Sequence, residues 1–311
     1  MSGRRTFVTL AVLGAVAAGV VAASRPSRPP HRTGTSAGGM EYLVLGDGTR
    51  TMLMLPGGPG SALPTGPLGR FMEGGAGRYA EAGYTVWTVT RRRGMPPGHT
   101  MADMADDHAV FIREELGGHV DVVLGESYGG LVAMYLAARH PALIGSLVLA
   151  GAAVTIEEEA RDTDVRWARQ RAAGKDSEAG ATFLGLALPR ARPWLRRVLG
   201  VVAGRVFAHQ SVPPGDLLVE AEAEATFDGR ALPAQIPVPT LVVCGEEDEF
   251  FPLDAVRETA AGIAGSTLVT YPGQGHMATL GGSDLPRDVL AWLARRDSET
   301  AATPRGDGRF V

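Results

Sequence analysis

The chain has 311 residues, of which 45% are hydrophobic, and a formal net charge of −4. This is enough apolar sequence for one large core, or for one core with an inserted subdomain. The absence of a long run of one charge sign argues against a nucleic-acid partner. The single cysteine, Cys244, excludes an intramolecular disulfide and lies in an apolar strand, which predicts a buried, inert thiol. No Cys/His cluster has metal-ligand spacing, so we expect neither a metal nor a cofactor.

The N-terminus differs in character from the rest of the chain. Arg4-Arg5 precede an apolar run over residues 7–23, and a Pro-rich polar stretch follows over residues 24–36. We interpret residues 1–38 as a signal peptide or membrane anchor plus a linker, with a start that is similar to a twin-arginine export signal. The run is marginal for the roughly 20 apolar residues that a bilayer span needs. We expect an exported protein, or one anchored facing outside with N-terminal membrane association, in preference to a cytoplasmic one.

Short apolar strands and helices then alternate along the chain. Residues 46–48 predict a hairpin turn between the first two strands. A Gly-rich loop, residues 56–60, follows the second strand, and Arg91 opens a basic loop that we interpret as a structural turn. The predicted elements in this part are strands at 41–45, 51–55 and 84–90, with a helix within 69–82.

The next helix carries clear boundary signals. Thr100 is the expected N-cap, with Asp103 three residues on, and Gly117-Gly118 end the helix. Apolar residues recur at helical spacing, and His108 lies on the same side of the helix as they do. We therefore expect His108 to be packed within the core and not catalytic.

The stretch from Asp121 to Pro141 predicts a nucleophile elbow. It begins as a buried strand, passes through Gly125-Glu126-Ser127-Tyr128-Gly129 and continues as an apolar helix that ends before Pro141. Strand, sharp turn and helix are the context in which a serine hydroxyl projects beyond a sheet edge. Ser127 is therefore the candidate nucleophile. Gly125 and Gly129 occupy positions where a side chain would collide with neighbouring elements.

The alternation of strands and helices predicts an α/β fold, with a mostly parallel central sheet flanked by helices. It breaks at residues 154–237, where the signals are helical and predict an inserted helical cap over the active site. Within the cap, residues 193–209 carry an apolar stripe that we expect to pack on the core or line the pocket. The predicted core is residues 39–153 and 238–296, and residues 297–311 form a polar, disordered tail.

Two further side chains can activate Ser127, and both follow strands of the same sheet. His276 lies in a Gly-rich loop after the last strand and is the candidate general base. Asp248 lies after the preceding strand and is the candidate that orients the imidazole, with Glu247 as the second choice. The oxyanion hole needs two backbone N–H donors, which we assign to Tyr128 and Gly58.

These residues resemble the α/β-hydrolase superfamily over about residues 40–296. The chain order Ser127, Asp248, His276 is similar to that of the family. Residues 56–60 look like the His-Gly-Gly-Pro-Gly loop of proline iminopeptidases, with Pro56 in place of the His that helps to fix that loop. The resemblance also implies that cap carboxylates could bind a substrate amine. The available ones, none of them assigned, are Glu157, Glu158, Glu159, Glu220, Glu222 and Glu224.

The expected activity is that of a serine hydrolase acting through an acyl-enzyme on a small to medium hydrophobic ester. An aminopeptidase acting on a short peptide is the alternative enzyme. An acyltransferase or lyase would use the same three residues. A ligand-binding, receptor-like protein with slow turnover is the alternative outside enzymes, because fold does not fix function.

Overall fold

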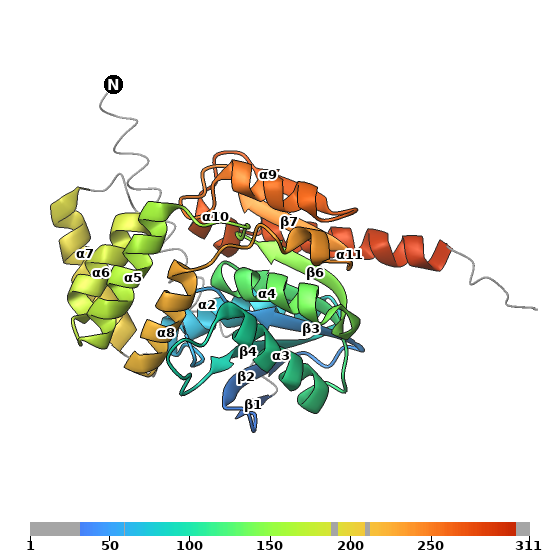
Figure 1. Cartoon of the computed structure of the whole chain (residues 1–311), viewed down its shortest axis with the longest axis horizontal. Coiled ribbons are helices and arrows are strands. Elements are labelled where there is room, and N and C mark those ends of the chain that lie inside the picture. The colour runs from blue at the N-terminus through green and yellow to red at the C-terminus, as the bar shows by residue number, and fades with distance from the viewer. Residues whose placement is uncertain (1–31, 59, 188–191, 209–211, 303–311) are drawn as a thin grey trace, which may run out of the picture.

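The computed structural model describes residues 32–302, except 59, 188–191 and 209–211 (Figure 1). Its centre is an eight-stranded sheet with the order β1-β2-β4-β3-β5-β6-β7-β8. The β1–β2 and β2–β4 pairs are antiparallel, and the other neighbouring strands are parallel. The strands are β1 (Arg32–Thr35), β2 (Met40–Leu45), β3 (Arg50–Leu55), β4 (Tyr84–Arg92), β5 (Val120–Glu126), β6 (Ile144–Ala150), β7 (Thr240–Gly245) and β8 (Thr267–Tyr271).

Helices cover both faces of this sheet, as predicted. One apolar cluster joins the sheet to α3, α4 and α9, and a second joins it to α2 and α11. The strands contain few polar residues and show little alternation of polar with apolar ones, because both faces of the sheet are buried. The bounds are α2 (Gly66–Glu81), α3 (Met101–Glu115), α4 (Tyr128–Arg139), α9 (Leu253–Gly262), α10 (His276–Gly281) and α11 (Asp284–Ala302).

In the described part of the chain, four α-helices lie between β6 and β7 in the sequence and gather at one side of the sheet (Figure 1). We call them the inserted helices: α5 (Glu158–Ala172), α6 (Asp176–Ala187), α7 (Pro193–Ala208) and α8 (Pro214–Ala225). The sequence did not predict α6. It packs closely on α7 through glycines, since a methyl group on Gly180 would lie 2.2 Å from the Gly200 carbonyl oxygen.

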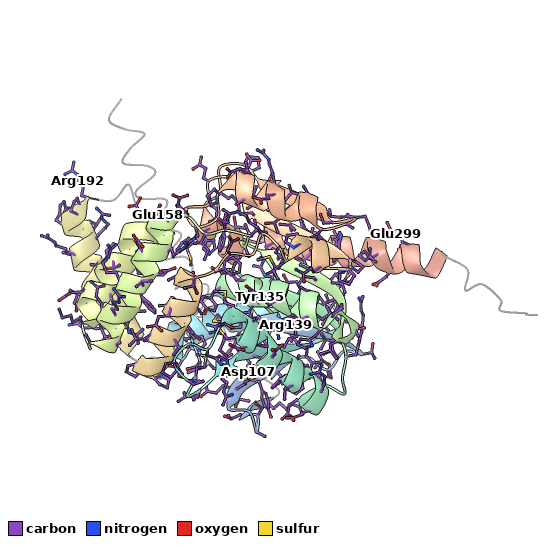
Figure 2. The ribbon with its side chains drawn as sticks, viewed as in Figure 1. Asp107, Tyr135, Arg139, Glu158, Arg192 and Glu299 are labelled. Carbon is purple, nitrogen blue, oxygen red and sulfur yellow. The ribbon has the colours of Figure 1, made fainter. Side chains whose placement is uncertain are left out.

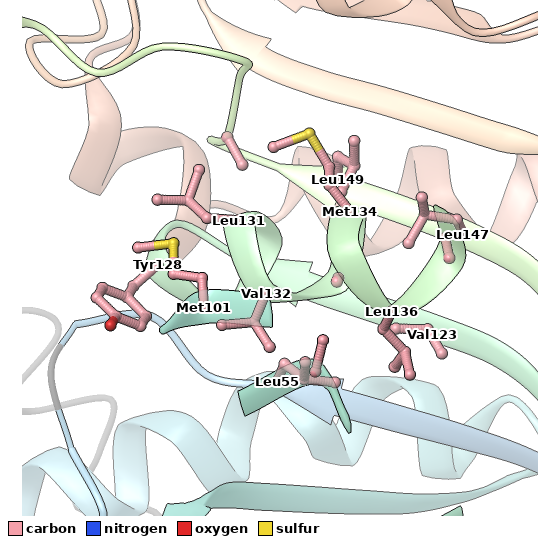
Figure 3. Packing of buried hydrophobic residues seen from close by; sticks show 14 of the residues in the cluster. Leu55, Met101, Val123, Tyr128, Leu131, Val132, Met134, Leu136, Leu147 and Leu149 are labelled. Carbon is pink, nitrogen blue, oxygen red and sulfur yellow. The ribbon is translucent and has the colours of Figure 1, made fainter. Parts of the chain in front are cut away.

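The helix α4 lies at the centre of the molecule. Its side chains Leu131, Val132 and Leu136 are fully buried, with Leu136 near Val123 of β5 (Figure 3). A helix that is apolar on most sides is stable only when it is enclosed by other elements. This packing fixes the position of the residue at its N-terminus, Ser127.

The predicted cap of α3 is confirmed. The Thr100 hydroxyl accepts a hydrogen bond from the Asp103 N–H at 3.2 Å, and the Asp103 carboxylate accepts one from the Thr100 N–H at 2.8 Å. His108 is fully buried on this helix, so its prediction as a packed residue is also confirmed.

The predicted hairpin between the first two strands is wrong. β2 and β3 do not pair, because β4 lies between them in the sheet. The chain at Gly48 instead passes against the start of β4, where a methyl group on Gly48 would lie 1.8 Å from the Gly83 carbonyl oxygen. The strand that pairs with β2 comes from farther along the chain.

The structure also changes both ends of the predicted core. Residues 32–35, assigned to the linker, form β1 and pair with β2. At the other end α11 continues to Ala302, so residues 297–302 are helical where a disordered tail was expected. Asp297 in this extension forms an ion pair with Arg50. Residues 1–31 and 303–311, with the predicted signal segment and the last part of the tail, lie outside the described residues.

Among the helices within the described part of the chain, none is long and apolar enough to cross a bilayer.

Candidate active site

The link between β5 and α4 forms a sharp elbow with Ser127 at its apex. Ser127 has φ 51° and ψ −122°, and it is the only non-glycine residue with positive φ among those the structure describes. Such a conformation costs of order 1–3 kcal/mol and persists where the surroundings enforce it. A methyl group on Gly125 would lie 2.6 Å from the Gly130 Cα, and one on Gly129 would lie 2.1 Å from the Leu55 carbonyl oxygen.

The other candidate residues reach the same place because their loops follow parallel strands. The carboxyl ends of β3, β5, β7 and β8 lie along one edge of the sheet. The loop with Gly58 follows β3, Asp248 follows β7, and His276 follows β8 at the first position of α10. α10 was not predicted, since residues 272–276 were expected to form only a loop.

Ser127, His276 and Asp248 form a continuous chain of contacts. His276 Nε2 lies 2.9 Å from Ser127 Oγ, and His276 Nδ1 lies 2.8 Å from Asp248 Oδ2. Asp248 Oδ1 accepts hydrogen bonds from the backbone N–H groups of Phe250 and Phe251, at 2.9 and 3.0 Å. The carboxylate is therefore fixed on both oxygens. Glu247, the second choice from the sequence, is not the residue that meets the imidazole.

The imidazole of His276 is held by packing as well as by Asp248. The Phe250 ring centroid lies 4.6 Å from it. On another side the chain has a glycine, Gly151, where an added methyl group would lie 3.0 Å from His276 Cε1. The backbone N–H of His276 donates to Glu249 Oε2 at 3.2 Å. These contacts leave the ring little freedom to rotate away from Ser127.

Cys244 lies under the same loop and is buried, as predicted. Its thiol donates to Asp248 Oδ2 at 3.4 Å. Burial, together with the nearby Asp248 carboxylate, raises the pKa of the Cys244 thiol. A thiol in this state is a poor nucleophile.

The Gly-rich loop after β3 passes beside the elbow. A methyl group on Gly57 would lie 2.9 Å from Ser127 Cβ, so glycine allows this close approach. Gly58 follows with φ +66°. Tyr128 is the first residue of α4, and its N–H has no carbonyl partner within the helix. The structure thus brings both predicted oxyanion-hole residues to the vicinity of Ser127.

Arg91 is a residue whose importance the sequence analysis missed. Its side chain is 1% exposed, donates from Nε to Glu220 Oε1 at 3.0 Å and from Nη1 to the Pro56 carbonyl at 2.7 Å. Nη2 donates to the Gly58 carbonyl. Arg91 therefore ties the Gly-rich loop to α8, and it is not part of a solvated turn. The available signal was its position at the end of a strand with buried residues.

Glu126 directly precedes Ser127 and is a partly buried carboxyl. No hydrogen bond or ion pair to another described residue involves its side chain. Burial, offset in part by the charge of His276, raises the pKa of Glu126 to about 7. This carboxyl is thus neutral in weakly acidic solution and ionised in weakly alkaline solution.

Two carboxyls of the inserted helices also approach this region. Burial raises the pKa of Asp164 on α5, and the charge of His276 acts in the opposite direction. Burial and the nearby Asp164 raise the pKa of Glu224 on α8. Neither carboxyl has a hydrogen-bonding or ionic partner among the described residues. Of the acidic residues noted in the sequence, Glu157, Glu158, Glu159 and Glu222 are exposed.

Asp164 was not among the sequence candidates. It lies four residues after the buried Ala160 and three before the buried Trp167. Its place on the buried side of an otherwise charged helix was the signal that could have identified it.

No group of three or more His, Cys, Asp or Glu residues suited to a metal ion occurs among the described residues. A groove of about 600 Å³ is lined by residues of β1, β2 and α2, including Thr33, Glu41 and Arg70. None of the residues that line this groove is a candidate catalytic residue, so we do not assign the reaction to it.

Comparisons with known proteins agree on one family. The family model described as alpha/beta hydrolase fold matches residues 50–283. The pimeloyl-[acyl-carrier protein] methyl ester esterase of Chromobacterium violaceum is 31% identical over 167 residues, which cover 50% of this chain and 62% of that protein. The 2-hydroxymuconate semialdehyde hydrolase of Pseudomonas putida is 28% identical over 201 residues, which cover 62% of this chain and 69% of that one.

A solved structure gives the same result for the fold. A hydrolase from Pseudomonas aeruginosa PA01 superposes with a TM-score of 0.63 at 25% sequence identity. The match covers 85% of this chain and 97% of the other.

Proposed function

The chain belongs to the α/β-hydrolase family, and from that membership we propose that it is a serine hydrolase that cleaves ester bonds through an acyl-enzyme. The observation that carries the proposal is the pair of contacts made by His276, 2.9 Å to Ser127 Oγ and 2.8 Å to Asp248 Oδ2. A serine hydroxyl is a weak nucleophile without an adjacent base, and this geometry supplies one.

The proposed reaction has two halves. Ser127 Oγ attacks the ester carbonyl carbon while His276 Nε2 takes the hydroxyl proton. The tetrahedral intermediate collapses, the bond to the alkoxy group breaks, and the imidazolium returns the proton to the departing alcohol. Water then attacks the acyl-enzyme with His276 again as the base, and the acid leaves as Ser127 recovers its proton. Asp248 stabilises the imidazolium and fixes its tautomer.

The negative charge on the carbonyl oxygen requires two donors in place before the reaction. We assign these to the N–H groups of Tyr128 and Gly58. Arg91 supports this assignment, because it binds the carbonyls of Pro56 and Gly58 and so limits the orientations that the peptide units of the loop can adopt.

An ester substrate is favoured by two observations. One relative is named a methyl ester esterase, and the imidazole of His276 lies against the apolar ring of Phe250. We therefore propose a small to medium, hydrophobic ester as the substrate.

An aminopeptidase is the second candidate, and a specific observation favours it. Asp164 and Glu224 have no hydrogen-bonding or ionic partner among the residues that the structure describes, and the charge of His276 affects Asp164. A cationic amine on the substrate would give these groups the partner that buried carboxyls need. The N-terminus of a short peptide is such an amine.

Ser127→Ala tests the main proposal. We expect kcat to fall by about 10⁴-fold or more while the circular dichroism spectrum stays unchanged. Ser298→Ala, an exposed serine on α11, serves as the control and should retain full activity. Retention of most activity by Ser127→Ala would remove Ser127 as the nucleophile.

A substrate panel separates the two candidates. Aryl esters of increasing acyl length are compared with amino-acid arylamides, using wild type and the double variant Asp164→Asn/Glu224→Gln. An esterase cleaves the neutral esters, and the double variant leaves them largely unaffected. An aminopeptidase prefers the arylamides, and the double variant raises their KM by roughly 10-fold or more. Cleavage of arylamides alone would overturn the ester proposal.

We also propose that the protein is exported or anchored facing outside, as the basic and apolar start of the sequence indicates. Cell fractionation of the full chain, with N-terminal sequencing of the product, tests this proposal. An intact chain confined to the cytoplasmic fraction would contradict it.

A further inference from the structure

The outward side of α7 is an exposed apolar surface. Its residues recur at intervals of three and four positions, so they share one side of the helix. The opposite side carries Gly200 and packs on α6. Of the stripe expected to pack on the core or line the pocket, Trp194, Val198 and Val202 face solvent, which corrects the prediction for them, whereas Leu195 and Leu199 are half-buried. The α7 apolar face comprises Trp194, Val198, Val201 and Val202, with exposed fractions of 59%, 58%, 41% and 57%.

The segment of the sequence that contains this face carries charges of one sign. Between Glu178 and Asp216 the sequence carries five arginines and no acidic residue, although the whole chain has a net charge of −4. Arg192 and Arg197 are exposed, and Arg192 lies beside the first turn of α7 at the edge of the molecule (Figure 2). Within this segment, the only charged residues that accompany the α7 apolar face are therefore cations.

We propose that the α7 apolar face docks on the surface of an anionic lipid membrane. Trp194 and the valines would enter the boundary between headgroups and acyl chains, where tryptophan is favoured. The arginines would lie along the surface and bind lipid phosphates, with their aliphatic stems over the apolar layer. These side chains are accessible to such a surface, since they are 41–59% exposed and α7 lies at the outer edge of the inserted helices in Figure 1.

Charge complementarity favours lipid over a second copy of the chain. Two α7 faces packed on each other would bring like charges together, whereas an anionic surface neutralises them. The N-terminal segment that precedes the folded part of the chain also favours an anionic membrane. The first acidic residue of the chain is Glu41, and Arg4, Arg5, Arg25 and Arg28 precede it together with the apolar run at residues 7–23.

Trp194 provides a local probe of docking. It is 59% exposed, whereas the other three tryptophans, Trp87, Trp167 and Trp292, are 5%, 7% and 4% exposed. The emission of the full chain is recorded with vesicles of phosphatidylcholine alone and of phosphatidylcholine mixed with phosphatidylglycerol. We expect a shift to shorter wavelength and quenching by brominated lipid with the anionic vesicles. Trp194→Phe should remove both the wavelength shift and the quenching, even if the N-terminal segment still binds the vesicles.

A paired substitution tests the face itself. Val198→Asp/Val202→Asp should lower the vesicle-bound fraction at low protein concentration by about tenfold or more, because charges replace two valines that docking would bury. Val110→Asp on α3, where the valine is 44% exposed, is the matched control and should bind as wild type does. All variants should retain wild-type hydrolysis of a soluble aryl ester, which shows that the fold survives.

Three outcomes would overturn the proposal. The first is a Trp194 emission that anionic vesicles leave unchanged. The second is a shift that needs no vesicles and grows with protein concentration alongside a dimer in sedimentation, which would make a second copy the occupant. The third is vesicle binding that the paired aspartates do not weaken relative to the Val110 variant.

Discussion

Arg91 is a buried cation whose three donor groups are all used. Its acceptors are Glu220, Pro56 and Gly58, which come from α8 and from the loop beside Ser127. A planar guanidinium can bind three acceptors in different directions, whereas the single ammonium of lysine cannot reproduce that arrangement. At the scale of a residue, the position of the Gly-rich loop therefore depends on one side chain.

Arg91→Lys should lower kcat for an aryl ester by roughly 10- to 100-fold with little change in KM, because an oxyanion donor would be misplaced. Arg92→Lys is the control. Arg92 is adjacent in sequence, and its ion pair with Asp107, at 3.6 Å, lies near the surface. Equal kinetics for Arg91→Lys and wild type would mean that the loop holds its position without the guanidinium.

Glu126 gives a stability prediction with a defined pH direction. Its pKa is raised to about 7 in the folded protein, mainly by burial, against a reference value of 4.5. Between these values the folded state holds a proton that the unfolded state has lost. The free energy of unfolding should therefore fall as pH rises from about 4.5 to 7, by roughly 2 to 3 kcal/mol for this group.

Glu126→Gln should remove that slope. Denaturant unfolding at several pH values measures it, and we expect the variant to gain stability over wild type at pH 8 but not at pH 4. Glu115→Gln, at an exposed position on α3, controls for the general effect of removing a charge. Parallel stability curves for Glu126→Gln and wild type across this pH range would contradict the prediction.

At the scale of an element, the elbow depends on close contact between backbones. Gly129 begins the turn of α4 that lies against the end of β3, and an added methyl group would meet the Leu55 carbonyl oxygen at 2.1 Å. Neither backbone segment can move without shifting the strand or the helix that it belongs to. Close packing thus makes glycine a requirement of the element.

Gly129→Ala should destabilise the protein by about 3 kcal/mol or more and abolish most activity. Gly74→Ala provides the opposite case on α2. No atom lies within 4 Å of its added methyl group, so this helix position should gain about 0.5–1 kcal/mol. Thermal unfolding of both variants tests the pair. A Gly129→Ala protein as stable as Gly74→Ala would show that the elbow can relax.

At the scale of the whole molecule, the inserted helices are joined to the core by buried polar contacts. The Asp216 carboxylate on α8 accepts from Ser61 Oγ at 2.5 Å and from the N–H groups of Met95 and Gly94 at 3.0 and 3.2 Å. The Tyr128 hydroxyl, beside the nucleophile, donates to the Glu220 carbonyl at 3.0 Å. α8 is therefore the inserted helix that these buried polar contacts attach to the core.

Asp216→Asn should loosen that attachment, because an amide has one accepting oxygen for three donors. We expect deuterium exchange in α8 to become faster by about tenfold or more. KM should rise while kcat changes little, since Ser127 and His276 belong to the core. Asp228→Asn, which alters an exposed ion pair with Arg230, is the control. Unchanged exchange in α8 would mean that apolar packing alone holds the insertion.

The sequence by itself determined the elements and the chemistry that local signals encode. The elbow around Ser127, the cap at Thr100 and the alternation of buried strands with helices depend on neighbouring residues, so short stretches are sufficient to predict them. The choice of Asp248 over Glu247 as the candidate partner of His276 also came from local spacing, and the structure places Asp248 against the imidazole.

Only the tertiary structure decided what depends on distant partners. The pairing of β2 with β4, the placement of Arg91 between α8 and the loop after β3, and the approach of Asp164 to His276 join segments far apart in the chain. The exposure of the α7 apolar face likewise depends on how distant segments pack. A periodic pattern identifies the apolar side of a helix, but the arrangement of the neighbouring helices decides whether that side is buried or left open to solvent.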